Sequence, residues 1–592
     1  MQELLRQTTA RLVNQLFGLQ VEVASVTINE TPAEFIGDFT VVIFPFVKAA
    51  RKSPDETGKL LGEALQNELA DIESFNVVKG FLNIQFTASS WMKEFDNAFH
   101  EPNFFLLPAT GKKIMVEYCA PNTNKPIHLG HVRNILIGYS VGEILKAAGN
   151  EVVKVNMIND RGVHICKSML AYQRFGSNET PESTRTKGDH FVGNYYVRFE
   201  TELKKQIAEG IAKGLNEEDA KKQSPLMKEI QVMLQQWENG DEEVRKLWSM
   251  MNGWVYEGFE STFKKIGNDF QHVYLESQTY LRGKQVVEEG LKQKVFFQKP
   301  DGSVWIDLTS EGLDEKLVLR ADGTSVYITQ DLGTAEMKFE DYHCDESIYV
   351  VANEQDYHFK VLKLICQKLN RPFANGIFHL NYGMVDLPTG KMKSREGTVV
   401  DADDLIAEME REAEQHTREQ GKIDGFTDSE LKNLFHQLGM GALKFFILKV
   451  DPKKRMIFNT QESIDFHGFT GPFIQYTHAR ICSVLRKATD EKIIASTSFN
   501  NYQLHADEKK LMVQLLQYPA VIKEAASKLE PYLLAHYLFH LAKNFNQFYA
   551  SLSIMKADSI EEKSFRLSLS EQVKRTLDAG MKLLGIEVPE RM

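Results

Sequence analysis

The feature that most constrains the fold is a strand, a helix and a second strand in close succession. Residues 113–118 contain the apolar run Ile114–Val116 and are typical of a buried strand. Residues 130–148 carry apolar side chains at helical spacing and end before Gly149, and residues 151–158 again resemble a strand. Such a βαβ unit predicts a parallel sheet with helices packed on its faces.

The same alternation of strands and helices resumes far along the chain. Residues 347–351 and 378–387 are strand-like, and the segment between them, 357–369, has helical spacing. Residues 170–310 are rich in charge and glutamine instead, and we interpret them as a mostly helical insertion. We therefore predict a Rossmann-type domain with a parallel sheet over residues 109–460.

The two ends of the chain differ from this central part. Residues 1–108 begin helically and continue in short alternating runs, which predicts an α+β domain, with Pro102, Pro108 and Gly111 in a connector. From about residue 428 long amphipathic helical patterns dominate, and we expect residues 461–592 to form an all-helical domain. The predicted fold class is multidomain α/β plus α.

Composition and charge exclude several other classes. With 43% hydrophobic and 26% charged residues, the 592-residue chain is neither disordered nor collagen-like. Net charge is −11, so nucleic-acid binding would need a local basic face. We expect no membrane span and no signal peptide. Five widely spaced cysteines without a CxxC pair favour a reduced, cytoplasmic location.

A histidine motif lies between the first strand of the βαβ unit and its helix: His128, Leu129, Gly130 and His131. A helix N-terminus offers unpaired N–H groups and a positive dipole end, which suit phosphate. Gly130 allows a nucleotide to approach the backbone, and two imidazoles can donate to a phosphate in its transition state. The alternative is a pair of incidental histidines, which the strand–loop–helix position disfavours.

A second motif follows the turn Pro388–Thr389–Gly390 and contains Lys391, Met392, Lys393, Ser394, Arg395, Glu396 and Gly397. A basic loop beside a strand end can close on a pyrophosphate leaving group. Alone it is more often a surface loop. Its pairing with a histidine motif at another sheet edge favours the functional interpretation.

The two motifs resemble the HIGH and KMSK motifs of class I aminoacyl-tRNA synthetases. Neighbouring segments narrow the resemblance to the arginyl-tRNA synthetase family: residues 117–126, 327–331, 353–356 and 471–480. Gly80–Asn83 resembles the N-terminal domain of that family, and Pro589–Met592 its C-terminus. The resemblance covers nearly the whole chain, and it is weakest over residues 170–310.

The resemblance implies a site for L-arginine. A guanidinium group is planar, always charged and rich in donors, so its pocket should supply carboxylates and other acceptors. The family places five residues of this chain around arginine: Glu117, Asn122, Tyr327, Asp331 and Gln355. We expect Asp331 to bind the guanidinium. Glu117 could also be a solvent-facing residue at a strand end, and Asp331 a charge at a helix N-terminus.

The implied reaction has two steps. The arginine carboxylate attacks the α-phosphate of ATP to give arginyl-adenylate and pyrophosphate, and a tRNA(Arg) ribose hydroxyl then takes the arginyl group. His128, His131, Lys125, Lys391 and Lys393 would stabilise the transition state, and Gly130, Met392 and Ser394 would help to bind ATP. Mg²⁺ would accompany ATP as part of the substrate. We expect no tightly bound cofactor or metal, and the family implies a monomer.

Two departures from the family pattern concern these motifs. Arg395 and Glu396 stand where a second family lysine is usual, which leaves the roles of Lys393 and Glu396 open; Lys125 could supply a cation from the other side. Asp160–Arg161–Gly162 replaces the Asp-Trp-Gly of many relatives.

Residues in both end regions suit tRNA. Strand alternation places Phe81, Asn83 and Gln85 on one face, where an aromatic ring and amides could bind a flipped-out base, although Phe81 could instead belong to the core. In the C-terminal region an anticodon-loop surface is expected from stacking groups and a cation, together with the terminal residue: Phe473, Tyr476, His478, Arg480 and Met592.

The alternatives are a class I synthetase of another specificity and a non-catalytic paralogue. Cys119 precedes His128 at a spacing also found in cysteinyl-tRNA synthetase, where the cysteine binds zinc, but no further ligands accompany it here. Glutamyl or glutaminyl specificity would require cations near the substrate. A non-catalytic paralogue that binds RNA or a protein is disfavoured because Lys125, His128, His131 and Lys391 are all present.

Overall fold

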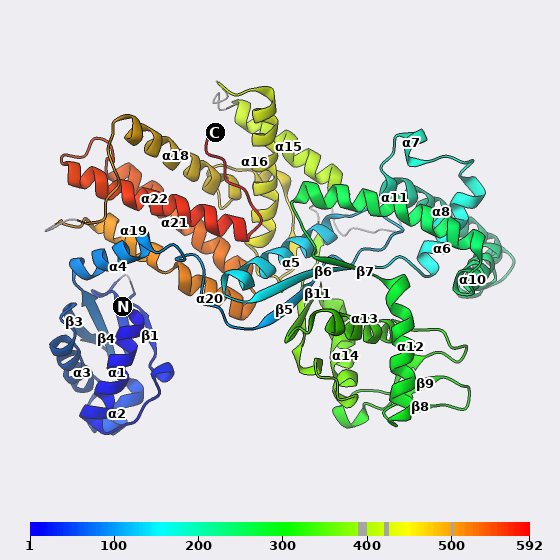
Figure 1. Ribbon diagram of the computed structural model, residues 1–592, viewed down its shortest axis with the longest axis horizontal. Helices are drawn as coiled ribbons and strands as arrows, with labels where there is room; N and C mark the ends of the chain where they lie inside the picture. The colour runs from blue at the N-terminus through cyan, green and yellow to red at the C-terminus, as the bar shows by residue number, and fades with distance from the viewer. Residues whose placement is uncertain (33, 387, 389–399, 420–424, 499–501) are drawn as a thin grey trace. The chain divides into compact units, whose positions relative to one another are not determined.

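The computed structural model in Figure 1 describes residues 1–592 apart from 33, 387, 389–399, 420–424 and 499–501. Its contacts divide the chain into two compact units. The larger unit contains residues 106–480, 520–542 and 577–592, and the smaller unit contains residues 1–105, 481–519 and 543–576.

The larger unit is built on a five-stranded sheet with the order β12-β11-β5-β6-β7, in which every neighbouring pair is parallel. Its strands are β5 (Lys113–Glu117), β6 (Glu151–Ile158), β7 (His272–Leu275), β11 (Glu346–Ala352) and β12 (Ile377–Tyr382). The predicted parallel sheet is confirmed. Because β5 comes first in the chain but lies in the middle, the strand order reverses between β5 and β11. Open α/β sheets bind ligands outside the carboxyl ends of the strands at such a point.

Helices cover both faces of this sheet (Figure 1). On one face, Gly138 of α5 (Leu129–Ala147) lies against the ring of Tyr118. On the other, Met337 of α13 (Tyr327–Tyr342) packs beside Met115 and Val153, and α14 (Asp356–Lys368) follows β11. Because helices cover both faces, every residue of β5 and β6 after the first is buried.

The end of α5 shows why the sequence stops the helix there. Gly149 has a φ of +89°, which favours glycine. A Cβ atom at this position would lie 2.1 Å from the carbonyl oxygen of Pro108, so a larger residue would displace the connector.

The segment after β6 is helical up to residue 266 and comprises α6 (Val163–Phe175), α7 (Pro181–Thr184), α8 (Gly188–Ala212), α9 (Glu217–Gln223), α10 (Pro225–Glu238) and α11 (Glu242–Ile266). The expectation of a mostly helical insertion over residues 170–310 does not hold in the second part of that range. There β7 joins the central sheet, α12 (Glu276–Lys292) packs on α13, and a small antiparallel sheet contains β8 (Phe297–Gln298), β9 (Val304–Ile306) and β10 (Lys316–Leu319). Strands of two to four residues are too short to give a recognisable alternation.

Helices dominate the remainder of the chain, as predicted: α15 (Ala402–Glu419), α16 (Asp428–Leu448), α17 (Thr460–Ser463), α18 (Gly471–Asp490), α19 (Ala506–Leu516), α20 (Tyr518–Lys528), α21 (Pro531–Ser551) and α22 (Ile560–Leu583). Short strands β13 (Val385–Asp386) and β14 (Met456–Ile457) pair in parallel. Among the described residues, no helix is both long and apolar enough to cross a membrane.

The N-terminal part of the smaller unit is an α+β structure, as predicted. Its antiparallel sheet has the order β1-β2-β4-β3, with β1 (Ile28–Glu30), β2 (Phe39–Val42), β3 (Ile72–Val78) and β4 (Phe81–Phe86). The accompanying helices are α1 (Gln2–Phe17), α2 (Phe44–Ala50), α3 (Pro54–Glu68) and α4 (Ala88–His100). Alternate residues of β4, namely Leu82, Ile84 and Phe86, are fully buried and form its core face.

Candidate active site

The histidine motif lies at the N-terminus of α5. His128 is the N-cap residue, and its Nδ1 accepts a hydrogen bond from the Gly130 N–H over 3.2 Å. Nδ1 of His131 accepts from the His128 N–H over 3.3 Å, and the two rings stack with centroids 3.9 Å apart. Nζ of Lys125 lies 3.4 Å from Nε2 of His128. The structure therefore brings these four predicted residues together.

The charge state of this cluster follows from its burial. Burial and the nearby Lys125 lower the pKa of His128 to about 3. Burial, His128 and Lys125 hold the pKa of His131 well below its usual value, so both rings are neutral at pH 7. Because each Nδ1 accepts a backbone N–H, each proton is assigned to Nε2. Two imidazole N–H groups and the Lys125 side chain thus converge, as phosphate oxygens require.

A segment that precedes α15 pairs with the histidine motif. The Leu129 N–H donates to the Val400 carbonyl over 3.0 Å, and the Ala402 N–H donates to the Ile127 carbonyl over 3.0 Å. Between them, His128 and Asp401 form an isolated antiparallel bridge. The second predicted motif, with Lys391, Met392, Lys393 and Ser394, lies outside the described residues.

The loop between β5 and the histidine motif has an unusual backbone. Cys119 and Ala120 have φ values of +80° and +47°, a conformation that costs a non-glycine residue about 1–3 kcal/mol. Their N–H groups donate to Oδ1 of Asn134 over 2.6 Å and Oδ1 of Asn156 over 3.1 Å. The two asparagines hold a strained turn at the carboxyl edge of the sheet, where functional sites often store strain.

Cys119 itself is buried, and burial raises the pKa of its thiol well above the usual value. It belongs to no group of potential metal ligands within the described part of the chain. The zinc-binding alternative therefore gains no support from its surroundings.

Two residues predicted to bind arginine flank this turn. Glu117 ends β5, is buried, and forms an ion pair through Oε2 with Lys338 of α13. Asn122 forms an isolated parallel bridge with Asn159 and so extends the pairing of β5 with β6 beyond the strands. No sequence pattern marked Lys338 as the internal cation that pairs with Glu117.

The other three predicted arginine residues lie on and beside α13 and α14. Oδ2 of Asp331 accepts a hydrogen bond from Nε2 of His358 over 2.5 Å. Tyr327, the first residue of α13, is 77% exposed and lines a cavity of about 450 Å³ together with His358. Gln355 is exposed in a short 3₁₀ helix after β11. His358 was not predicted, although it lies only three residues after Gln355.

A buried carboxylate at the same edge was also missed. Glu276 is the first residue of α12, directly after β7, and its Oε1 accepts from Nε2 of Gln330 over 2.6 Å. Burial raises the pKa of Glu276 to about 7, and the negative charges of Asp160 and Asp331 act in the same direction. No sequence signal marked Glu276, because the strand before it was not recognised.

The unusual triplet Asp160–Arg161–Gly162 follows β6. Oδ2 of Asp160 accepts from Oγ of Ser277 over 2.6 Å. The Arg161 guanidinium lies 4.0 Å from the Tyr280 ring centroid and donates to Glu238 over 2.8 Å. These contacts join the end of β6 to α10 and α12, so the triplet holds the helical segment at the carboxyl edge.

The predicted tRNA face of the smaller unit is only partly accessible. Phe81 is 41% exposed and packs edge-to-face on Phe44, and Gln85 is half-buried. Asn83 is 1% exposed, with its amide oxygen bonded to Thr40 and its amide nitrogen bonded to Asn76. Alternation correctly placed the three side chains on one face, but Asn83 is covered there and cannot meet a base in this conformation.

The predicted anticodon residues lie in and near α18. The Phe473 ring lies 5.1 Å from that of Phe539, and the Arg480 guanidinium lies 4.8 Å from the Tyr476 ring centroid. His478 is buried, and its Nδ1 lies 2.9 Å from the Pro589 carbonyl oxygen. His478 thus fixes the C-terminal segment that ends in the half-buried Met592.

Comparisons with known proteins match almost the whole chain. Models described as "Arginyl tRNA synthetase N terminal domain", "tRNA synthetases class I (R), catalytic domain" and "DALR anticodon binding domain" match residues 1–86, 105–460 and 474–592.

The chain belongs to the arginyl-tRNA synthetase family.

Individual members of the family are similar over their full length. The arginine–tRNA ligase of Amoebophilus asiaticus is 53% identical over 595 residues, with 99% of both chains covered. That of Parabacteroides distasonis is 51% identical, with 98% of both covered. The solved structure of the Thermus thermophilus arginyl-tRNA synthetase matches with a TM-score of 0.80 at 25% identity and covers 100% of this chain and 99% of that one. The three-part fold is that of the family.

Proposed function

We propose that this chain attaches L-arginine to tRNA(Arg) through an arginyl-adenylate and is an arginine–tRNA ligase. The observation that carries the proposal is that one edge of one parallel sheet holds both kinds of group that the reaction needs. Phosphate-binding donors lie at the start of α5, and carboxylates for a guanidinium lie on α12 and α13.

For the first step, we assign ATP to the N-terminus of α5. The Nε2–H groups of His128 and His131 and the ammonium of Lys125 stabilise charge that develops on the α-phosphate when the arginine carboxylate attacks. Gly130 leaves space for the nucleotide, since the nearest atoms to a Cβ there would be those of the His128 ring. No protein nucleophile is required. Lys391, Met392, Lys393 and Ser394 are proposed to bind the pyrophosphate side.

For arginine, we assign the guanidinium to Asp331, with Tyr327 beside it. Glu276 supplies a second carboxylate near Asp331 and joins the residues proposed from the sequence. Asn122 and Gln355 bind the α-amino and carboxylate end. Glu117 contributes through its Oε1, because Oε2 is paired with Lys338.

For tRNA, we assign Phe81 and Gln85 to an unstacked base and the surface around Phe473, Tyr476 and Arg480 to the anticodon loop. His478 and Met592 act there by holding the C-terminal segment. We propose functional domains at residues 1–108, 109–460 and 461–592. We also propose Mg²⁺ bound with ATP, a monomer, and a cytoplasmic location.

Arginine-dependent exchange between ATP and pyrophosphate tests the function. It should be measured with and without tRNA(Arg), with lysine and cysteine as control substrates. Exchange with arginine supports the proposal, and Asp331→Asn should abolish it while Asp356→Asn, on the neighbouring α14, retains it. Exchange with another amino acid would contradict the substrate assignment. Folded protein that binds tRNA but exchanges no amino acid would favour a non-catalytic RNA-binding protein.

A further inference from the structure

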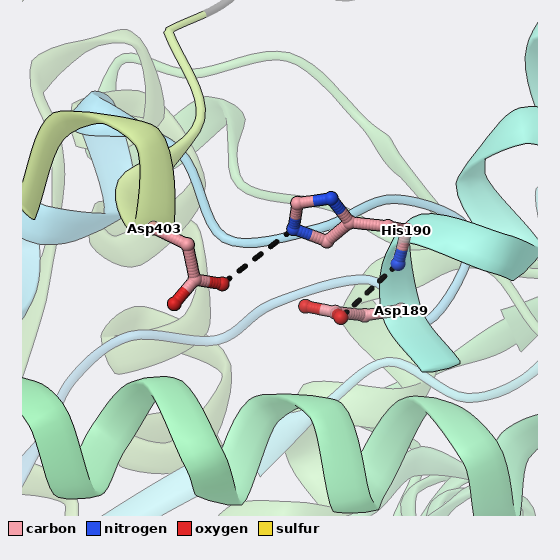
Figure 2. Close-up of side chains that lie close together, drawn as sticks. All are labelled: Asp189, His190 and Asp403. Atoms are coloured by element: carbon pink, nitrogen blue, oxygen red, sulfur yellow. Dashed lines mark hydrogen bonds and ion pairs between the residues drawn. The ribbon is translucent and has the colours of Figure 1, made fainter. Parts of the chain in front are cut away.

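A cluster of charged side chains joins three helices beside the histidine motif. It consists of Lys187, Asp189 and His190 at the start of α8, Lys265 at the end of α11, and Asp401 and Asp403 at the start of α15. Figure 2 shows the His190 ring directed at Asp403, with Asp189 below it at the start of the same helix. Nε2 of His190 lies 3.2 Å from Asp401 Oδ2 and 3.5 Å from Asp403 Oδ2.

The cluster has the residue types of a metal site but not its charge. Ligand atoms of Asp189, His190 and Asp403 lie within 4.8 Å of one another. The Lys187 ammonium already lies among them, 3.1 Å from Asp189 Oδ2 and 2.7 Å from Asp403 Oδ2. An ammonium in this place repels a metal cation, so the carboxylates are neutralised by side chains instead.

A protonated His190 balances the charges of the cluster. Lys265 binds Asp403 over 2.8 Å, so Lys187 and Lys265 compensate two of the three carboxylates. An imidazolium at position 190, which contacts Asp401 and Asp403, compensates the third. Hydrogen bonds to Asp401 and Asp403 raise the pKa of His190 to about 10, in agreement with this count.

The cluster is connected to the ATP site through the backbone. Asp401 lies opposite His128 in the antiparallel bridge, and the hydrogen bonds of Leu129 and Ile127 to Val400 and Ala402 flank it. Whatever fixes Asp401 therefore also fixes the strand-like segment against which His128 is placed.

We propose that His190, as an imidazolium, is a positioning residue for arginine activation. It holds Asp401 and Asp403, and through them the backbone of residues 400–402. This backbone pairs with the histidine motif and keeps His128 in the position from which it contacts ATP. This proposal rests on the proposed role of His128 toward ATP.

Three variants in the full-length chain test it by arginine-dependent ATP–pyrophosphate exchange with tRNA. His190→Gln keeps a donor but loses the charge, and His190→Arg keeps the charge. In Asp401→Asn the side-chain oxygen still accepts from the N–H groups of Asp403 and Asp404 at the helix start, and the charged oxygen that faces His190 becomes a neutral amide group. The matched control is His436→Gln, because Nδ1 of His436 lies 2.7 Å from Glu410, also on α15 but without a contact to the motif.

We expect His190→Gln to lower kcat for exchange roughly 10- to 100-fold, with the KM for arginine changed less than about twofold, because misplacement disturbs the reacting geometry rather than arginine binding. His190→Arg should retain most of kcat. Adding Asp401→Asn to His190→Gln should lower kcat no further, because the uncompensated charge is then removed.

Three outcomes would overturn the proposal. The first is a kcat for His190→Gln equal to that of His436→Gln, and the second is a double variant in which the losses of kcat from the two substitutions multiply. The third is a kcat for His190→Arg as low as that for His190→Gln, with an unchanged melting temperature. Absence of exchange in the wild-type chain would instead refute the proposed function. The two failures are therefore distinguishable.

Discussion

Nε2 of His358 donates a hydrogen bond to Oδ2 of Asp331 across 2.5 Å, and so ties α14 to α13 at the carboxyl edge of the sheet. An ionised carboxylate can only accept, which identifies His358 as the donor. The contact fixes the orientation of the carboxylate proposed for the guanidinium.

Replacing His358 should therefore weaken arginine binding. A hydrogen bond to a charged group contributes about 1.5–3 kcal/mol, so His358→Phe should raise the KM for arginine roughly tenfold or more and leave the KM for ATP unchanged. Steady-state exchange kinetics measure both constants. His379→Gln is the control. Nδ1 of His379 lies 3.1 Å from Oδ1 of Asp356, a similar contact to a residue that is not assigned to arginine. Equal KM values for the two variants would contradict the assignment.

The neutral histidines at the start of α5 predict a loss of stability in acid. His128 has a pKa of about 3 when folded and 6.5 when unfolded, so the unfolded state binds more protons below pH 6.5. The free energy of unfolding should fall by up to about 1.4 kcal/mol per pH unit between these values, and the depressed pKa of His131 adds to the effect. Urea midpoints of wild type and His128→Asn, measured from pH 7.5 to 4.5, should show a weaker dependence in the variant. Parallel curves would refute this.

Arg133 on α5 should be intolerant of lysine. It is fully buried, and its guanidinium donates to the carbonyl oxygens of Met384, Pro452 and Lys454 over 3.1, 3.1 and 2.7 Å. A lysine cannot reproduce this fork and leaves buried acceptors unpaired, at about 1–3 kcal/mol each. Arg133→Lys should lower the melting temperature by several degrees. Arg174→Lys, in an exposed pair with Glu229, should change it little; similar shifts would count against the argument.

Phe81 and Asn83 should respond differently although they share a strand face. Phe81→Ala removes an exposed stacking ring, so the KM for tRNA should rise roughly tenfold while the KM for arginine stays constant. Asn83→Ala removes buried hydrogen bonds to Thr40 and Asn76 and should instead destabilise the smaller unit. Aminoacylation kinetics and thermal unfolding separate the two effects. An unchanged KM for tRNA in Phe81→Ala would exclude the proposed contact.

The sequence was informative where one local pattern determines the structure. The strand before Glu117, the helix after His128 and its end at Gly149 all follow from apolar periodicity and a helix stop, and the structure has them in these places. The family motifs also indicated that segments distant in the sequence belong to one site, which apolar periodicity cannot predict.

Contacts between elements that are distant in the sequence could not be predicted. Glu276 follows a four-residue strand in charged surroundings. His358 acquires its partner only when α14 packs on α13, and Lys338 acquires its partner only when α13 packs on β5. Asn83 shows the converse limit. Alternation gives the face of a strand but not whether neighbouring side chains cover that face.

The position of β5 in the central sheet has a consequence for synthesis of the chain. One neighbour, β6, is made soon afterwards, whereas the other, β11, pairs with β5 through residues such as Glu346, more than 200 residues later. At about 5–20 residues per second, a nascent chain exposes one edge of β5 for roughly 10–50 seconds. An unpaired apolar edge invites association with other chains, so we expect ribosome-bound chains that end before β11 to require chaperones.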